Sequence, residues 1–232
     1  DGFQKTVGIK TIRRKWATDP RFRNLLVAEG KLVADLIHEN IQQVYQLVEF
    51  GDTIAIIMEW VHGVTFEDIN ARLDERNDYL PPELAVFLVS RVARALAYAH
   101  SLTDEDGEPL GLVHRDIKPD NVMISCEGMV KLLDFGIARA ADRLATATKT
   151  DMTRGTVHYM SPEQVRASKD IDFRSDLFSF GVMFWECLMG ERLIRAESAV
   201  GALLEVATFE PNEALLRVAE AFPEAVPIFE QL

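Results

Sequence analysis

The sequence has 232 residues, which is enough for one large domain or for two small lobes that share a cleft. Apolar residues make up 48% of the chain and charged residues 27%, a composition that argues against disorder over most of its length. The 25 basic and 37 acidic residues give a net charge of −12, which argues against nucleic acid or an anionic membrane as a partner.

The sequence shows no sign of secretion or membrane insertion. Its first five residues are mostly polar and predict no signal peptide. The most hydrophobic stretch, residues 177–189, is too short to span a bilayer, which takes about 20 apolar residues. The two cysteines, Cys126 and Cys187, are too few for a disulfide framework. We therefore expect reduced thiols and a cytoplasmic location, with a membrane anchor outside this segment as the open alternative.

The first sixty residues predict a small sheet that carries one helix. Residues 5–12 alternate as a strand, with Gly8 and Lys10 on one face. Asp19 and Pro20 then have the N-cap and first-turn pattern of a helix start. Two further strands are predicted near Val44–Phe50 and Thr53–Trp60.

Glu29 stands out in the predicted helix because it lies inside the apolar stripe. It follows Leu25 by four residues and precedes Val33 by four. A carboxylate that faces a core is costly unless it is paired, and Lys10 on the preceding strand is a candidate partner. The alternative is a glutamate at the edge of the stripe that reaches water.

After a break at Gly63 the sequence changes to mainly helical patterns. A long helix is predicted at Pro82–Leu102, and a buried one at 177–189. Short strands are predicted at Val122–Ser125 and Val130–Leu133. The polar, threonine-rich segment 145–156 shows no periodicity, and long loops of this kind tend to be functional.

Three motifs carry the functional assignment. They are His-Arg-Asp-Ile-Lys-Pro-Asp-Asn at 114–121, Asp-Phe-Gly at 134–136, and Ser-Pro-Glu at 161–163 preceded by Gly-Thr at 155–156. In order and spacing they resemble the signature set of eukaryotic-type (Hanks-type) protein serine/threonine kinases. The resemblance covers nearly the whole chain and implies an α+β, two-lobed kinase-like fold with ATP and Mg²⁺ as cofactors.

The resemblance assigns the phosphoryl-transfer chemistry to four residues. Asp116 would orient the substrate hydroxyl and accept its proton, and Lys118 would place a positive charge near the moving phosphoryl group. Asn121 and Asp134 would supply oxygen ligands for magnesium. The lysine at position 118 resembles serine/threonine kinases rather than tyrosine kinases. The alternative for each loop aspartate is an ordinary solvated turn or cap residue.

The resemblance also implies a set of nucleotide-binding residues. Lys10 would hold the α- and β-phosphates and pair with Glu29, and backbone groups near Met58 would bind adenine. Gly8 departs from the family, which usually has alanine as the ceiling of the adenine site. For Met58 and Met123 the alternative is a place in the apolar core. The complete set of implied nucleotide-binding residues is Gly8, Lys10, Glu29, Met58, Glu59, Val61, Met123 and Asp134.

Other motif residues are expected to have structural or regulatory roles. His114 and Phe135, together with Val33 and Val44, would form the packed column beneath the site. Asp176, two residues after Arg174, would hold backbone amides of the catalytic loop, and Thr156 would contact that loop. Arg115 resembles kinases controlled through the loop 134–163, whose candidate phosphorylation sites are Thr146, Thr148, Thr150 and Thr153; solvated threonines are the alternative.

The expected domain organisation is a partial N-terminal lobe at 1–61 and a C-terminal lobe at 62–232. Nothing in residues 1–6 resembles the Gly-rich loop of the family. By resemblance the chain also stops before the last helices and the arginine that pairs with Glu163. We therefore expect a fragment cut at both ends, with Glu163 short of a partner.

The expected activity is ATP- and Mg²⁺-dependent phosphorylation of Ser/Thr hydroxyls in protein substrates. One alternative is an impaired kinase fragment or a pseudokinase that acts as a binding module, against which the retained Lys10, Asp116, Asn121 and Asp134 argue. Another is a small-molecule kinase of the antibiotic-phosphotransferase type, which lacks the Ser-Pro-Glu segment. The acidic insertion 103–109 and the motif Gly-Thr-x-x-Tyr-Met-Ser-Pro-Glu-Gln resemble bacterial members.

Overall fold

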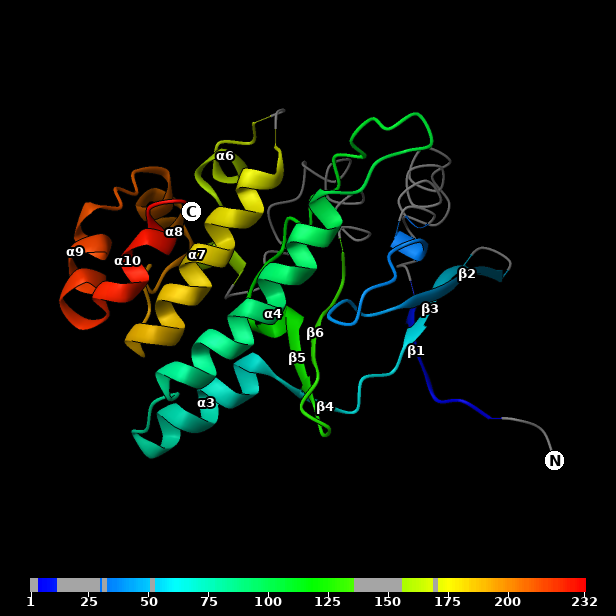
Figure 1. Ribbon diagram of the computed structural model, residues 1–232, viewed down its shortest axis with the longest axis horizontal. Coiled ribbons are helices and arrows are strands. Elements are labelled where there is room, and N and C mark those ends of the chain that lie inside the picture. Colours follow the sequence, from blue (N-terminus) through cyan, green and yellow to red (C-terminus); the bar gives the residue numbers. More distant parts are fainter. Residues whose placement is uncertain (1–3, 12–29, 31–32, 51–52, 136–155, 169–170) are drawn as a thin grey trace.

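The computed structural model describes residues 4–11, 30, 33–50, 53–135, 156–168 and 171–232. Within these ranges, a small sheet lies beside a larger part that is mainly helical (Figure 1). This arrangement agrees with the α+β class that the sequence predicts.

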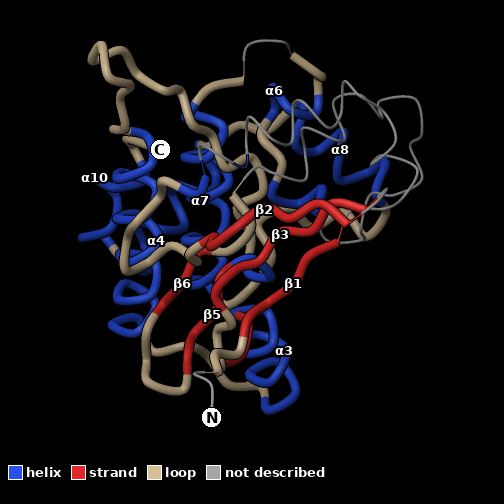
Figure 2. The backbone as a smooth tube through the Cα atoms, turned by 90° about the vertical axis from the view of Figure 1, so that its right-hand side faces the viewer, coloured by secondary structure: helices blue, strands red, loops and turns tan. Residues whose placement is uncertain are grey.

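The small sheet contains strands β1 (Val7–Thr11), β2 (Val44–Phe50) and β3 (Thr53–Glu59) in the order β1-β3-β2, and both pairs are antiparallel. Figure 2 shows the three strands side by side. Ile54 and Ile56 on the central strand are buried, at 0% and 2% exposure. The three strands expected in this part of the chain are all present, with small differences at their ends.

A second sheet contains β4 (Gly63–Thr65), β5 (Val122–Ser125) and β6 (Val130–Leu132) in the order β4-β5-β6. The sequence analysis placed helices directly after Gly63, and for these three residues it was wrong. Gly63 pairs with Ser125, and the absence of a side chain allows the two strands to approach closely. A Cβ atom built on Gly63 would lie only 2.0 Å from the carbonyl oxygen of Ile124.

The helices of the larger part begin with α3 (Phe66–Arg76), which starts at a capping box between Thr65 and Asp68. Helix α4 (Pro82–His100) and helix α7 (Phe173–Met189) occupy the ranges that the sequence predicts, apart from their ends. These two helices pack against each other (Figure 1). Together they form the frame on which the candidate site is built.

Helix α7 is buried on most sides, as its apolar sequence predicts. Phe180, Met183, Phe184 and Trp185 are all nearly inaccessible, and the helix ends at Gly190 in the left-handed conformation. No helix within the described residues is long and apolar enough to cross a membrane. The other helices named within the described residues are η1 (Pro119–Asn121), η2 (Thr156–Tyr159), α6 (Pro162–Val165), α8 (Ala199–Ala207), α9 (Asn212–Ala221), η3 (Pro223–Ala225) and α10 (Val226–Phe229).

Two expected features lie outside the described residues. They are the start of the helix at Asp19 and Pro20, and the threonine-rich segment 145–156 except for Thr156. Both cysteines are described and free, with Cys126 exposed and Cys187 buried.

We predict that Gly63→Ala lowers the free energy of unfolding by about 1–3 kcal/mol, because the new methyl group would meet backbone atoms that cannot move aside cheaply. The measurement is chemical denaturation of the full-length protein. Val64→Thr is the matched control, since Val64 lies next to Gly63 and is exposed, so its replacement should change stability by less than about 0.5 kcal/mol. Equal stability of Gly63→Ala and the wild type would contradict the close approach of β4 and β5.

Candidate active site

The segment 114–121 is held in place by one buried carboxylate. Asp176, in the first turn of α7, is fully buried and accepts hydrogen bonds from the backbone N–H groups of His114 and Arg115, each at 2.7 Å. A third contact, at 2.8 Å, joins Asp176 Oδ2 to Nε2 of His100 at the end of α4. A buried carboxylate is tolerated when it is fully hydrogen-bonded in this way. The expectation that Asp176 holds backbone amides of this loop is confirmed.

Arg174 does not take part in this arrangement. Its side chain is exposed and forms a bidentate pair with Asp172, the N-cap of α7, with the shortest distance at 2.7 Å. The pair holds the pKa of the Asp172 carboxyl below its usual value, chiefly through the hydrogen bonds from Arg174. Arg174 therefore contributes to the start of the helix rather than to the site.

His114 is buried as a neutral ring. Its Nε2 donates to the carbonyl of Leu133 at 2.7 Å, so Nδ1 is the acceptor for the backbone N–H of Asp116 at 3.3 Å. The ring meets Phe135 edge to face, with 4.6 Å between centroids. Burial lowers the pKa of His114, although Asp176 and the Leu133 carbonyl act in the opposite direction. His114 thus packs beneath the site.

Three of the four residues expected to carry the chemistry, Asp116, Lys118 and Asn121, lie in one hydrogen-bonded group. Nδ2 of Asn121 donates to the carbonyl of Asp116 at 2.7 Å and to its carboxylate at 3.0 Å. Nζ of Lys118 lies 3.3 Å from the same carboxylate oxygen, and it donates to Thr156 Oγ1 at 3.0 Å. The expected contact of Thr156 with this loop is therefore present. The arrangement leaves a carboxylate that is oriented from two sides and partly open to solvent.

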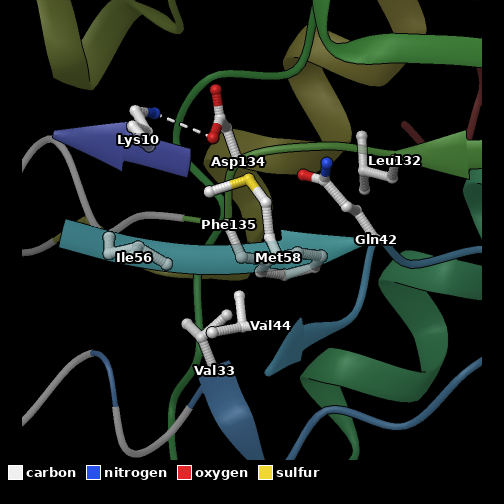
Figure 3. A pocket seen from close by; sticks show the side chains of 9 residues that line it. All are labelled: Lys10, Val33, Gln42, Val44, Ile56, Met58, Leu132, Asp134 and Phe135. Atoms are coloured by element: carbon white, nitrogen blue, oxygen red, sulfur yellow. Dashed lines mark ion pairs between the residues drawn. The ribbon is translucent and has the colours of Figure 1, made fainter. Parts of the chain in front are cut away.

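Asp134 is joined to both the loop and the small sheet. The N–H of Leu133 donates to the carbonyl of Asn121 at 2.8 Å, which fixes the chain just before Asp134. Asp134 itself has a φ of 56°, a left-handed conformation that is uncommon for a residue with a side chain. Its Oδ1 forms an ion pair with Nζ of Lys10 at 2.8 Å (Figure 3). This pair was not expected from the sequence; Glu29, the expected partner of Lys10, lies outside the described residues.

The oxygen atoms of Asp134 and Asn121 suit a hard cation such as magnesium, which needs only one or two carboxylates when phosphates and water complete its shell. No cluster of three or more His, Cys, Asp or Glu side chains that could hold a metal occurs within the described residues.

A pocket lies between β3, β6 and the Lys10–Asp134 pair (Figure 3). Its apolar walls include Val33, Val44 and Phe135, which belong to the packed column expected beneath the site. A Cβ atom on Gly8 would lie 3.1 Å from the side chain of Met58, so glycine gives this methionine room. The full lining is Lys10, Val33, Gln42, Val44, Ile56, Met58, Leu132, Asp134 and Phe135.

The residues expected to bind adenine through their backbone lie at the end of β3 and just after it. The N–H of Glu59 donates to the carbonyl of Gln43 at 2.8 Å, and its carbonyl accepts from Nε2 of Gln42 at 2.9 Å. The carboxylate of Glu59 pairs with Lys131 at 3.0 Å. Val61 is buried, at 7% exposure. At Glu59, the backbone group left for the expected contact with adenine is the carbonyl, which can accept a second hydrogen bond.

Of the other expected residues, Met123 lies in β5 opposite Thr65 and Lys131, outside the lining of this pocket. Glu163 is not short of a partner, because Oγ of Ser175 donates to it at 2.6 Å. The expectation that Glu163 has no partner was wrong, although this partner is a neutral hydroxyl group on α7 and not an arginine. The candidate phosphorylation sites Thr146, Thr148, Thr150 and Thr153 lie outside the described residues.

Sequence reasoning missed three side chains that shape the site. Gln42 enters the pocket, His100 contacts Asp176, and Lys131 pairs with Glu59. Their partners are 17 to 76 residues away in the chain, so no local spacing reveals them. A polar glutamine two residues before strand β2 was the one available signal.

Comparison with known proteins finds a family model and several relatives that are all protein kinases. The family model "Protein kinase domain" matches residues 2–221. The "Tyrosine-protein kinase MasK" of Myxococcus xanthus is 36% identical over 92% of this chain and 33% of that protein. Serine/threonine-protein kinase PrkC of Bacillus subtilis is 35% identical over 88% of this chain and 29% of that protein. Serine/threonine-protein kinase PknB of Mycobacterium tuberculosis is 35% identical over 90% of this chain and 32% of that protein.

Among solved structures, the kinase domain of Mycobacterium tuberculosis PknI matches with a TM-score of 0.65 and 26% identity, over 94% of this chain and 76% of that chain. This match confirms the predicted two-lobed fold. The chain spans about a third of the length of the curated relatives named above.

We predict that His114→Phe flattens the dependence of stability on pH. Because burial lowers the pKa of His114 below its ordinary 6.5, the unfolded chain takes up the proton first. The stabilisation is therefore complete above about pH 6.5 and is lost as the pH falls, by at most about 1.4 kcal/mol per pH unit. Denaturation between pH 7.5 and 5.5 should give a smaller loss for the variant than for the wild type. Identical losses would show that His114 is not held neutral by the fold.

Proposed function

This chain belongs to the protein kinase family, and on that premise we propose that the protein transfers the γ-phosphoryl group of ATP to Ser/Thr hydroxyl groups of protein substrates. The observation that carries the proposal is the hydrogen-bonded group of Asp116, Lys118 and Asn121. A pseudokinase would have no need of an oriented, solvent-accessible carboxylate beside a lysine.

Asp116 is the proposed catalytic base. Its carboxylate accepts the proton of the substrate hydroxyl while the hydroxyl oxygen forms a bond to the γ-phosphorus, and the bond from phosphorus to the bridging oxygen of ADP breaks. Asn121 holds one carboxylate oxygen at 3.0 Å, which aligns the base. Lys118 is close enough, at 3.3 Å, to stabilise the negative charge on Asp116 and on the phosphoryl group in transit.

Lys10 and Asp134 are the proposed phosphate and metal residues. Lys10 would bind the α- and β-phosphates, with Glu29 as a second partner, and it forms an ion pair with Asp134 at 2.8 Å. Asp134 and Asn121 are the proposed magnesium ligands. Magnesium supplies charge neutralisation on the phosphates when it is bound. For the base of ATP, we propose the carbonyl of Glu59 and the backbone of Val61, with Gly8, Met58 and Met123 as apolar contacts.

The organisation proposed from the sequence is kept, with a smaller lobe at 1–61 and a larger lobe at 62–232. The interval between the end of β3 at Glu59 and the start of β4 at Gly63 supports this boundary. We propose a cytoplasmic location for the domain because its phosphoryl donor, ATP, is found there. The net charge of −12 supports protein substrates rather than nucleic acid as partners.

The proposal that Ser/Thr rather than Tyr accepts the phosphoryl group is supported by Lys118 and by the names of relatives. PrkC and PknB are named serine/threonine-protein kinases, whereas MasK is named a tyrosine-protein kinase at similar identity. Phosphoamino-acid analysis of labelled protein substrate separates the two classes. Phosphoserine or phosphothreonine supports the proposal, and phosphotyrosine alone would overturn this part of it.

We predict that Asp116→Asn lowers kcat by about 10²- to 10⁴-fold and leaves the Kd of ATP nearly unchanged, because Asp116 orients the hydroxyl and does not hold the nucleotide. The measurement is steady-state phosphorylation of a protein substrate by the full-length protein, with ATP binding measured separately. Asp74→Asn is the control, since this exposed aspartate lies on α3. A kcat near that of the wild type would remove Asp116 as the base.

A further inference from the structure

Gln42 is the one uncharged polar side chain among the described residues that line the pocket. We infer that it selects the base of the nucleotide: its carboxamide oxygen accepts a hydrogen bond from the amino group at position 6 of adenine. This inference rests on the proposed use of ATP at this site. Figure 3 shows the carboxamide beside Met58 and Leu132, on the same pocket as Lys10 and Asp134.

The main chain of Gln42 is fixed to the second sheet. Its N–H donates to the carbonyl of Leu132 at 2.9 Å, and Ile41 forms an isolated bridge with the same residue. Two residues earlier, the buried amide of Asn40 donates to the carbonyl of Val130 at 2.9 Å. These contacts hold the main chain of Gln42 in place before any nucleotide binds.

The side chain of Gln42 has only one stable orientation. Its Nε2 donates to the carbonyl of Glu59 at 2.9 Å. A carbonyl oxygen only accepts hydrogen bonds, so a flipped carboxamide would place two acceptor oxygens against each other. The nitrogen therefore faces Glu59, and within the described residues no donor contacts Oε1 of Gln42. The oxygen is left as an acceptor on the pocket side of the residue.

The two oxygens together form an acceptor pair. The carbonyl of Glu59 has a second lone pair, and Gln42 holds its own oxygen near by through the bond to that same carbonyl. The amino group of adenine carries two N–H bonds and can donate one to each oxygen. A purine with a carbonyl oxygen at position 6 would place that oxygen against two acceptor oxygens. Rotating the carboxamide of Gln42 to offer its N–H instead would break the hydrogen bond from Gln42 to Glu59.

A purely structural role for Gln42, tying its segment to Glu59, makes a different prediction. Loss of such a tie would weaken the binding of every nucleotide alike. Recognition of the base would change the ranking of nucleotides that differ only at position 6. The two roles are therefore separated by a set of base analogues rather than by activity alone.

The experiment measures the Kd of ATP, of inosine triphosphate (oxygen at position 6) and of purine riboside triphosphate (hydrogen at position 6) for the full-length protein with Mg²⁺. For Gln42→Leu we expect the Kd of ATP to rise about fivefold. The Kd of purine riboside triphosphate should stay within about twofold, and that of inosine triphosphate should stay the same or fall. The preference for ATP over inosine triphosphate should therefore fall at least about fivefold.

The matched control is Gln43→Leu, which removes the neighbouring carboxamide. Nε2 of Gln43 donates to the carbonyls of Ala34 and Val44, and its side chain does not line the pocket. This variant should keep the nucleotide preference of the wild type. If Gln42→Leu does not fold, as judged by thermal unfolding, Gln42→Met carries the same expectations with a side chain of similar length.

Three results would overturn the inference. A rise in Kd that is equal for the three nucleotides would show that Gln42 is only structural. An unchanged preference in a folded variant would show that Gln42 does not contact the base. Wild-type protein that binds no ATP would overturn the proposed function itself, and the inference with it; the first two results leave the proposed function standing.

Discussion

The candidate site depends on the hydrogen bonds that the fully buried carboxylate of Asp176 accepts. This carboxylate accepts two backbone N–H groups from His114 and Arg115 and contacts His100, so the start of the catalytic segment is bound to helix α7 and to the end of helix α4. Arg115 has a φ of 67°, a conformation that needs such support. Asp116 follows Arg115 directly, and the rest of the segment is itself hydrogen-bonded. The hydrogen bonds to Asp176 therefore determine where Asp116 lies.

From this anchor, contacts continue to the small sheet. Asn121 joins the segment to the chain just before Asp134, and Asp134 pairs with Lys10 on β1. Gln42, which also lines the pocket, bonds both to β6 and to the carbonyl of Glu59. The pocket therefore lies where the two sheets approach each other, and its polar groups come from both. The residues proposed to act together on a phosphoryl group are in this way held by separate elements.

Much of this could be predicted from the sequence. Asp116, Lys118 and Asn121 lie within six residues of one another, so a short motif revealed them. The resemblance to protein kinases, and with it the fold, is confirmed by the family and structure matches. The sequence analysis missed β4, since three residues are too few for a periodic signal. It also missed Gln42 and the partner of Glu163, because tertiary contacts decide which distant side chains meet.

The most direct test of the account is Asp176→Asn, which keeps the shape of the side chain but removes its charge and one acceptor. Measured by amide hydrogen exchange in the folded protein, His114 and Arg115 should exchange about 10- to 100-fold faster, because hydrogen bonds to a charged group are worth about 1.5–3 kcal/mol. Phosphorylation should fall at the same time, since Asp116 follows these residues directly. Unchanged exchange together with unchanged phosphorylation would contradict the claim that Asp176 holds the catalytic segment in place.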